Sequence, residues 1–275
     1  MIVKIILIIA ACGAAIFGLI IALKFKKGRD ELIKCFTEEN CILFGAKGAG
    51  KDLIFNKVIN CRDQQCYANI PYNKELCVVK DIRDLSVAPN DYKNILNDDI
   101  KIIPKINKEC CDYYISDGGI FLPSQYSGEL VKNYPSLPIY YALSRHLTNS
   151  NIHINTQYLG RVWDKLREQA AYYIRALHTT KLFITYGKGE NRREHGFLIT
   201  SFIVYDNYQS ALSKMRPFEN KKLFEGAEGA AAKADFIAKH GNIKEYKIIQ
   251  FIGNVHYDSR HFHKRFYGYN SPDSL

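Results

Sequence analysis

The chain of 275 residues contains little that would bind zinc. Its eight cysteines all lie at or before Cys111. None forms a Cys-x-x-Cys pair, since Cys61 and Cys66 are too far apart and Cys110 and Cys111 are adjacent. This spacing excludes the usual zinc-binding patterns. We expect the cysteines to be buried reduced thiols, which is consistent with a reducing compartment.

Acidic residues are also few relative to basic ones. Asp and Glu total 28 against 38 Lys and Arg, which gives a formal net charge of +10. A basic surplus suits contact with nucleic acid or with anionic lipid and does not choose between them. The length allows one good-sized core, so one main domain is expected.

One apolar run is long enough to cross a membrane. It covers Ile5 to Leu23, and as a helix it would be about 28 Å long, close to the roughly 30 Å hydrocarbon core of a bilayer. We therefore expect a single transmembrane helix. The positive-inside rule places its amino terminus outside and the rest of the chain in the cytoplasm. The basic residues that follow the run at once are Lys24, Lys26, Lys27 and Arg29.

Two other interpretations of this segment fit less well. Ile9 to Cys12 resembles a lipoprotein cleavage box, and the whole run resembles a signal peptide. The run continues well beyond Cys12, however, and its basic flank is on the wrong side for export. Small residues also recur every fourth position, which either permits close helix pairing or reflects the general frequency of small residues in membrane helices. These residues are Ala10, Ala14, Gly18 and Ala22.

The stretch from Cys41 to Val58 predicts a phosphate-binding loop. A short apolar strand at Cys41 to Phe44 precedes the spacing Gly-x-x-x-x-Gly-Lys at Gly45 to Lys51, and a helix begins near Asp52. The glycines let several backbone N–H groups point at one centre, and the helix start adds partial positive charge. Lys51 would reach the outer phosphates. A glycine-rich turn can be only a turn, but this full context favours nucleotide binding.

Two positions depart from the usual pattern. The residue after the lysine is Asp52 in place of a Ser or Thr that would contact magnesium; its carboxylate can ligate the ion but brings negative charge close to the phosphates. Asp117 ends the apolar strand Tyr113 to Ser116 and is expected to reach the magnesium. Gly118 then stands where a glutamate would orient the attacking water. These departures favour nucleotide binding with slow or partner-dependent hydrolysis.

The second half of the chain predicts further elements of the same sheet. Ile152 to Gln157 is a strand that ends in polar side chains, where nucleotide-contacting groups sit in parallel sheets. Trp163 to Leu177 has the spacing of an amphipathic helix. Lys181 to Tyr186 and Phe197 to Tyr205 predict two strands of a projecting hairpin.

The C-terminal part gives weaker signals. Gly226 to Lys239 can form a helix and Tyr246 to Ile252 a final strand. Tyr257 to Tyr269 is basic and aromatic; it would either contact single-stranded DNA or dock its rings on its own domain. His261 and His263 lack a third ligand, so a metal pair is not expected.

Together these elements predict an α/β fold. We expect a P-loop NTPase with a mostly parallel central sheet flanked by helices, plus one N-terminal transmembrane helix and a C-terminal β-hairpin and tail. The expected domains are the transmembrane helix with its basic flank (1–27), the P-loop NTPase domain (28–205) and a basic, aromatic C-terminal extension (206–275).

Several short motifs in order resemble the zonular occludens toxin-like family, the assembly ATPases of filamentous phages (inoviruses). The resemblance covers roughly residues 41–205. Unlike the better-known members of that family, this chain has its apolar span before the domain. The motifs are the Walker-type loop, Asn69-Ile70-Pro71, the Asp117 strand, Arg145-His146, Ile152 to Gln157, and Leu166 to Ala170.

The resemblance implies a membrane-anchored ATPase, with ATP and Mg²⁺ as cofactors, that drives assembly and export of virions at the inner membrane of a bacterial host. It implies catalytic roles for Lys51, Asp117, Gln157 and Arg145, with Gln157 near the terminal phosphate. Arg161 and Arg167 join Arg145 as candidates for an arginine that reaches a neighbouring subunit's nucleotide. The expected metal ligands are Asp52 and Asp117. The expected nucleotide-binding residues are Gly45, Ala46, Lys47, Gly48, Ala49, Gly50, Lys51, Asp52 and Leu53.

The expected partners are the membrane, further copies of the chain with a hexamer as the candidate assembly, phage coat or assembly proteins, and single-stranded DNA. Two other functions stay open. One is a degenerate nucleotide-binding membrane scaffold without turnover, favoured by Asp52 and Gly118. The other is a DNA-translocating motor of the conjugation type, from which the series Arg145 to Ala170 points away.

Overall fold

The structure is a computed structural model, and it describes residues 2–62, 65–72, 77–79, 112–124, 127–133, 137–186, 193–215, 226–241 and 243–254. In the first helix, the side chains of residues 2–11 and 14 are outside this description. The predicted aromatic tail (257–269), Cys110, Cys111 and the tip of the predicted hairpin (187–192) lie outside the described residues.

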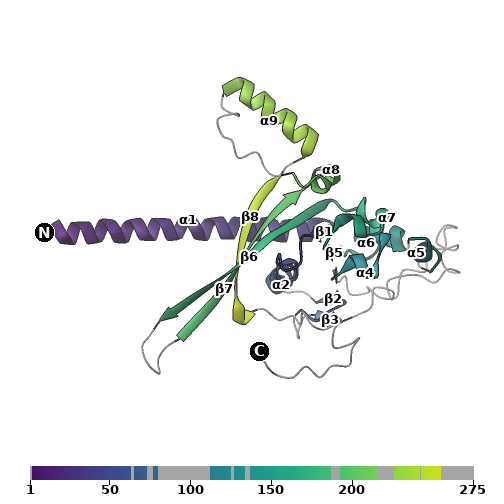
Figure 1. Cartoon of the computed structure of the whole chain (residues 1–275), viewed down its shortest axis with the longest axis horizontal. Coiled ribbons are helices and arrows are strands. Elements are labelled where there is room, and N and C mark those ends of the chain that lie inside the picture. Colours follow the sequence, from purple (N-terminus) through teal and green to yellow (C-terminus); the bar gives the residue numbers. More distant parts are fainter. Residues whose placement is uncertain are drawn as a thin grey trace.

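The fold is built on one mixed sheet with helices against both faces (Figure 1). Its strand order is β3-β2-β4-β5-β1-β6-β7-β8. The first six pair in parallel, and β7 and β8 add antiparallel. The mostly parallel α/β sheet that the sequence predicts is confirmed. The strands are β1 (Cys41–Phe44), β2 (Cys66–Ala68), β3 (Cys77–Val79), β4 (Tyr113–Ile115), β5 (Ile152–Thr156), β6 (Tyr172–Tyr186), β7 (Arg193–Tyr205) and β8 (Lys244–Phe251).

Two apolar clusters lie on the two faces of the sheet. One joins Phe36 and Phe55 with Tyr114, and the other contains Trp163 and Tyr141. Both clusters are fully buried at these positions, so each face has its own core. The helices are α1 (Ile2–Glu38), α2 (Lys51–Cys61), α4 (Gly118–Phe121), α5 (Ser127–Asn133), α6 (Leu137–Thr148), α7 (Asp164–Arg167), α8 (Tyr208–Leu212) and α9 (Gly226–His240), with 3-10 turns η3 (Leu159–Arg161) and η6 (Ile252–Asn254).

The amphipathic helix predicted over Trp163 to Leu177 is wrong. Only α7 is helical there, and β6 begins at Tyr172. The apolar spacing fits a helix because Trp163 and Leu166 do pack into the core. From Tyr172 onward, aromatic and β-branched residues pair in parallel with the free edge of β1, and this tertiary pairing decides the conformation.

Helix α1 is continuous from Ile2 to Glu38, so the predicted connector after Leu23 is helical (Figure 1). It crosses β8 closely at Gly28, where an added Cβ would lie 2.1 Å from the carbonyl oxygen of Lys247. In the described part of the chain, no helix combines the length and hydropathy needed to cross a membrane. Residues 5–11 and 14 of the predicted span lie outside the described side chains.

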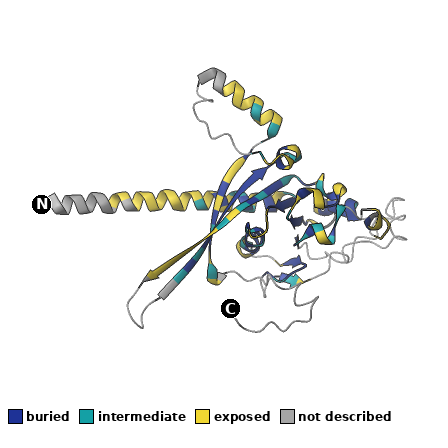
Figure 2. Cartoon of the chain, viewed as in Figure 1, coloured by how far each residue is buried: buried dark blue, intermediate teal, exposed yellow. Residues whose placement is uncertain are grey.

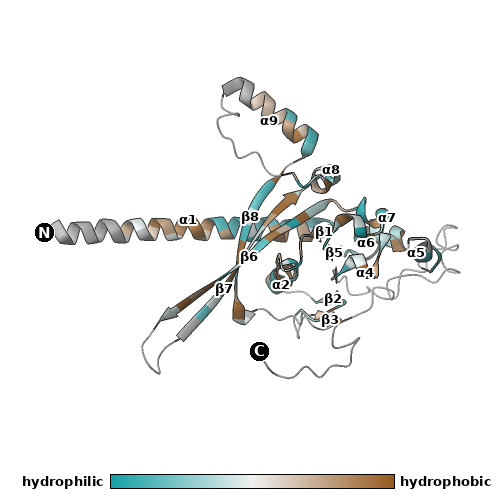
Figure 3. Ribbon diagram, viewed as in Figure 1, coloured by the Kyte–Doolittle hydropathy of each residue, from teal (hydrophilic) through white to brown (hydrophobic). Residues whose placement is uncertain are grey.

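The described apolar side chains before Leu23 are exposed. Ile16 is 60% exposed and Phe17 65%. Figure 2 shows this part of α1 projecting away from the sheet as an exposed helix, and Figure 3 shows that much of it is hydrophobic.

The C-terminal part joins the same sheet. Strand β8 pairs along β7, and Gln250 on β8 donates a 2.7 Å hydrogen bond to the carbonyl of Leu53 in α2. Asn56 in turn donates to Gln250 at 3.2 Å. Residues 244–251 of the expected extension therefore help to hold the helix that follows the phosphate loop.

Most described cysteines are buried, as expected. Four are buried and two exposed, and all six are reduced thiols. Burial raises the pKa of Cys35 to about 12, which keeps this thiol protonated. The buried cysteines are Cys35, Cys41, Cys66 and Cys77, and the exposed ones are Cys12 and Cys61.

Candidate nucleotide site

The loop between β1 and α2 has the backbone of an anion-binding turn. Gly48 and Gly50 have φ angles of +77° and +98°, in the left-handed region that favours glycine. An added Cβ at Gly50 would lie 2.1 Å from Thr179 Oγ1, because β6 runs past the end of β1 and packs behind the loop. Thr179 also donates to the Ala49 carbonyl at 3.1 Å. The loop thus has a rigid support on the side of β6.

Lys51 is the buried cation of this loop. It is only 7% exposed, and its Nζ donates to the carbonyls of Gly45 at 3.1 Å and Ala46 at 3.0 Å. Burial lowers the pKa of Lys51, and the nearby carboxylates of Asp52 and Asp117 oppose that shift. Two of the three N–H donors of Nζ are thus taken by loop carbonyls, and the oxygens of a phosphate bound at the loop would accept from the same group.

Asp52 lies at the start of α2 and receives three hydrogen bonds on one oxygen. Its Oδ1 accepts from Tyr72 Oη at 2.8 Å, Asn155 Nδ2 at 2.6 Å and Ser116 Oγ at 3.2 Å. An aspartate in the first turn also interacts favourably with the helix dipole, so the side chain of Asp52 is oriented by both contacts.

Ser116, the residue after β4, is fixed by its backbone as well as by its hydroxyl. Asn69 at the end of β2 donates to its carbonyl and accepts from its N–H, each at 2.7 Å. The hydroxyls of Ser116 and Tyr72 are also hydrogen-bonded. Ends of β2, β4 and β5 therefore meet the first turn of α2 through one polar network of Tyr72, Ser116, Asn155 and Asp52.

Asp117 follows Ser116 at the same edge of the sheet. Its φ of 54° is left-handed, a conformation that Asp adopts more readily than most residues. Burial raises the pKa of its carboxyl, the Asp52 carboxylate raises it further, and Lys51 lowers it. These mutual effects bring Lys51, Asp52 and Asp117 into one electrostatic cluster beside the loop.

The strand between the loop and Asp117 contributes two polar residues. Strand β5 pairs with both β1 and β4, and the register Phe44↔Thr156 brings Gly45 and Gln157 out of neighbouring strands at one edge. Asn155 is 1% exposed, and its Oδ1 has no hydrogen-bond partner among the described residues. A buried acceptor without a donor lowers the stability of the fold, which indicates that a water or ligand atom lies beside it.

The three predicted arginines lie in different places. Arg145 is at the opposite, amino-terminal edge of the sheet, exposed and ion-paired with Glu39 at 2.6 Å, so within one chain it is away from the loop. Arg167 is largely buried and lies over the ring of Tyr208. Arg161 is exposed near Gly119, on the loop's side of the sheet. A contact with a neighbouring subunit stays a prediction for Arg145 and Arg161.

The remaining predicted nucleotide residues lie in the loop as expected, although their contributions differ. Ala46, Lys47 and Gly48 are exposed, whereas Ala49 is buried. The side chain of Leu53 is buried, and its backbone N–H is among the first four of α2, which have no partner within the helix.

The residues present suit a magnesium ion. Mg²⁺ takes hard oxygen ligands and is usually held in nucleotide sites by one or two side chains together with phosphate oxygens. Asp52 and Asp117 supply carboxylates beside the loop, and Asn155 Oδ1 is an unpaired buried oxygen in the same network.

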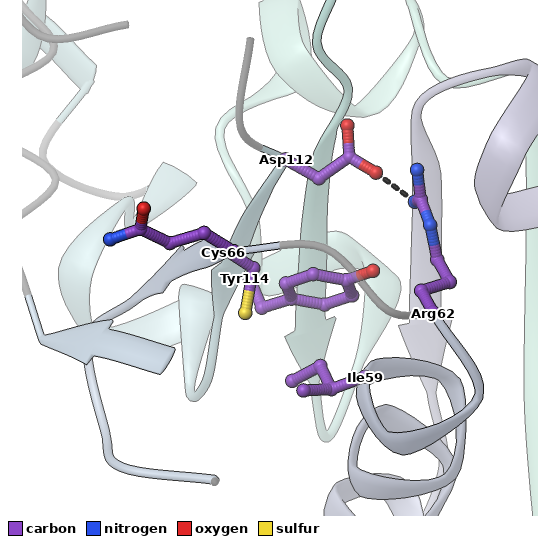
Figure 4. Close-up of a pocket in the computed structure, with 6 residues that line it drawn as sticks. Ile59, Arg62, Cys66, Asp112 and Tyr114 are labelled. Atoms are coloured by element: carbon purple, nitrogen blue, oxygen red, sulfur yellow. Dashed lines mark hydrogen bonds and ion pairs between the residues drawn. The ribbon is translucent and has the colours of Figure 1, made fainter. Parts of the chain in front are cut away.

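A second polar cluster at the other edge of the sheet is structural. A small cavity there is lined by Ile59, Arg62, Gln65, Cys66, Asp112 and Tyr114. Figure 4 shows the guanidinium of Arg62 facing the carboxylate of Asp112, with which it forms an ion pair. Arg62 also donates to the carbonyl of Phe36 at 3.2 Å. The pair ties the ends of α1 and α2 to β4 and lies away from the phosphate loop.

Sequence reasoning missed Tyr72, Ser116 and Asn155. Asn155 carried a signal, since it lies in the strand whose polar end was expected at the site. Tyr72 and Ser116 carried none, because their meeting with Asp52 depends on which strands are neighbours.

No protein-family model matches the chain, and no curated protein matches it in sequence. Its structure is similar to the N-terminal domain of zonular occludens toxin from Neisseria meningitidis, with 13% identity and a TM-score of 0.38, over 67% of this chain and 96% of that one. It is also similar to the genome packaging NTPase B204 from Sulfolobus turreted icosahedral virus 2. The complex with ATP-gammaS gives 12% identity and a TM-score of 0.38, over 78% of this chain and 99% of that one. At these values the site assignment rests on the chain's own contacts.

Proposed function

We propose that this chain is a membrane-anchored P-loop ATPase that powers assembly and export of filamentous phage virions at the inner membrane of a bacterial host. The glycine-rich loop is the observation that supports nucleotide binding. Lys51 is buried over a glycine turn with left-handed φ angles, between the carboxylates of Asp52 and Asp117.

In this proposal the loop N–H groups and Lys51 bind the phosphates, the carboxylates of Asp52 and Asp117 lie beside Mg²⁺, and Gln157 lies near the terminal phosphate. Magnesium would neutralise charge that develops on the phosphates. The residues of the chain orient the nucleotide and keep its phosphates against the edge of the sheet.

Anchoring in the membrane is supported by α1. Its exposed apolar residues project from the domain, and its basic residues follow before the helix reaches β8. This arrangement suits a single span with the amino terminus outside and the domain in the cytoplasm. The phage role is supported by the motif series from the loop to Ala170, and implies a homo-oligomer that acts on single-stranded DNA or coat protein.

The experiment measures ATP binding and hydrolysis by the full chain in detergent, with Lys51→Ala as the test and Lys47→Ala as the matched control. Both lysines lie in the loop, but Lys51 is buried and Lys47 exposed. We expect Lys51→Ala to weaken binding strongly and Lys47→Ala to change it little. No binding by the unmodified chain, with background hydrolysis in all three proteins, would contradict the enzyme proposal.

A nucleotide-binding scaffold without turnover is the second candidate. It is favoured by Asp52, whose carboxylate is committed to three hydrogen bonds at the position of the usual hydroxyl. Tight ATP binding that depends on Lys51, with no hydrolysis under any condition or partner, would select this function.

A further inference from the structure

We propose that the hydroxyl and the carboxylate that hold magnesium in a P-loop site have exchanged places in this chain, with the carboxylate on Asp52 and the hydroxyl on Ser116. The inference rests on the proposed nucleotide site and assigns its metal-binding pair. In P-loop NTPases the hydroxyl follows the loop lysine, and the carboxylate is an aspartate at the end of a neighbouring strand.

The contact that supports the exchange joins residues from these two positions. Asp52 follows Lys51, where the hydroxyl residue is expected. The side chain opposite it, at the end of β4, is Ser116, whose Oγ donates to Asp52 Oδ1 at 3.2 Å. A hydroxyl and a carboxylate thus face each other across the same two elements, in reversed order.

The alternation of β4 explains why Ser116 and not Asp117 faces α2. Tyr114 packs against Phe55 of α2 with ring centroids 5.3 Å apart. Side chains two apart along a strand share a face, so Ser116 continues on the side of α2. It is 2% exposed, and Asn69 clamps its backbone by two hydrogen bonds. The backbone and side chain of Ser116 are therefore held in a fixed position.

The surrounding donors fit a carboxylate at this place. Tyr72 and Asn155 both donate to Asp52 Oδ1, while no described residue donates to its Oδ2. One carboxylate oxygen is thus oriented by the protein, and the other is left for a cation. Asn155 Oδ1, buried and without a partner among the described residues, adds a further oxygen to the same network.

The exchange also assigns a different role to Asp117. If Ser116 takes the place of the metal-binding aspartate, then Asp117 stands one residue later, where the usual glutamate orients the attacking water. Gly118 then no longer marks a missing residue. Both departures of the sequence follow from one reciprocal exchange.

The test restores the ordinary order. We compare the full chain in detergent with Asp52→Ser, Ser116→Asp and the double variant D52S/S116D, and use D52S/S116N as the matched control that carries no carboxylate at either position. The measurement is the gain in affinity for a fluorescent ATP analogue when Mg²⁺ is added. We expect D52S to lose about tenfold or more of that gain, D52S/S116D to recover most of it, and D52S/S116N to recover none.

Thermal unfolding gives a second readout. Ser116→Asp alone places two carboxylates face to face and should lower the melting temperature, and adding Asp52→Ser should relieve this repulsion. If the single Ser116→Asp variant does not fold, the comparison of D52S/S116D with D52S/S116N still shows whether a carboxylate at position 116 restores the magnesium effect.

Equal magnesium effects in these two double variants, with magnesium-free ATP binding retained, would overturn the exchange and leave nucleotide binding standing. Absence of ATP binding by the unmodified chain would overturn both.

Discussion

The side-chain amide of Asn155 donates a 2.6 Å hydrogen bond to the carboxylate of Asp52 and so joins the end of β5 to the first turn of α2. Asn155 is 1% exposed, and Asp52 is half-buried. Because β5 lies between β1 and β4, this bond couples the strand beside the loop to the helix that follows it. The phosphate loop is therefore held from the sheet as well as from its own backbone.

Replacing the donor by an acceptor should break this coupling. Asn155→Asp is isosteric but sets a second carboxylate against Asp52, so we expect a loss of about 2–3 kcal/mol in the free energy of unfolding. Asn149→Asp is the control, since Asn149 is exposed and its left-handed φ of 50° suits Asp. Urea unfolding measures both variants. Equal small losses would show that the Asn155 bond does not stabilise the fold.

The two glycines of the loop should respond differently to alanine. Gly48→Ala and Gly50→Ala both force a side chain into the left-handed region, at roughly 1–2 kcal/mol. Space is open around Gly48, whereas a Cβ at Gly50 would lie 2.1 Å from Thr179 Oγ1. Thermal unfolding and ATP affinity should therefore suffer more in Gly50→Ala, and Thr179→Ala should partly rescue that variant. Identical losses would mean that β6 does not support the loop.

The buried ion pair between Arg62 and Asp112 should stabilise the fold more than the exposed ion pair between Arg145 and Glu39. Asp112→Asn leaves the Arg62 guanidinium without its carboxylate and should lower the free energy of unfolding by about 3 kcal/mol. Glu39→Gln breaks the exposed pair with Arg145 and should lower it by less than about 1 kcal/mol. Denaturant unfolding at neutral pH compares the two variants. Similar losses would show that the buried pair of Arg62 and Asp112 does not stabilise the fold more than the exposed pair.

The same variant predicts a dependence on pH. Burial acts to raise the pKa of Asp112, but His153 and Arg62 outweigh it and hold that pKa below its ordinary value of 3.8. A lowered pKa in the folded state gives stability that is present above the ordinary value and lost as the pH falls through the folded-state value. The difference between the unmodified chain and Asp112→Asn should therefore shrink below about pH 4. Burial lowers the pKa of His153, so protonation of this side chain also reduces the stability of the unmodified chain, over a higher pH range than that of Asp112.

Local patterns predicted the site's scaffold better than its contacts. The strand Cys41 to Phe44 and the helix after the loop were predicted correctly because a short apolar run, the glycine spacing and the lysine all lie within one short stretch. The helix over Trp163 to Leu177 failed because pairing with β1 overrides local spacing. Ser116 could not be recognised from the sequence, since its role depends on the order of strands in the sheet and on the side of β4 that faces α2.

Asp117 separates the two assignments of the metal site. Asn is the suitable replacement, because it keeps the shape and tolerates the left-handed φ of 54°. If Asp52 and Ser116 form the metal-binding pair, Asp117→Asn should keep the magnesium-dependent gain in ATP affinity and lower the hydrolysis rate by about 10²–10⁴-fold, since it removes the base that orients water. ATP binding and steady-state hydrolysis by the full chain in detergent measure the two effects. If Asp117→Asn instead loses the magnesium-dependent gain as fully as Asp52→Ser does, Asp117 is itself a metal ligand and Ser116 only a neighbour of Asp52.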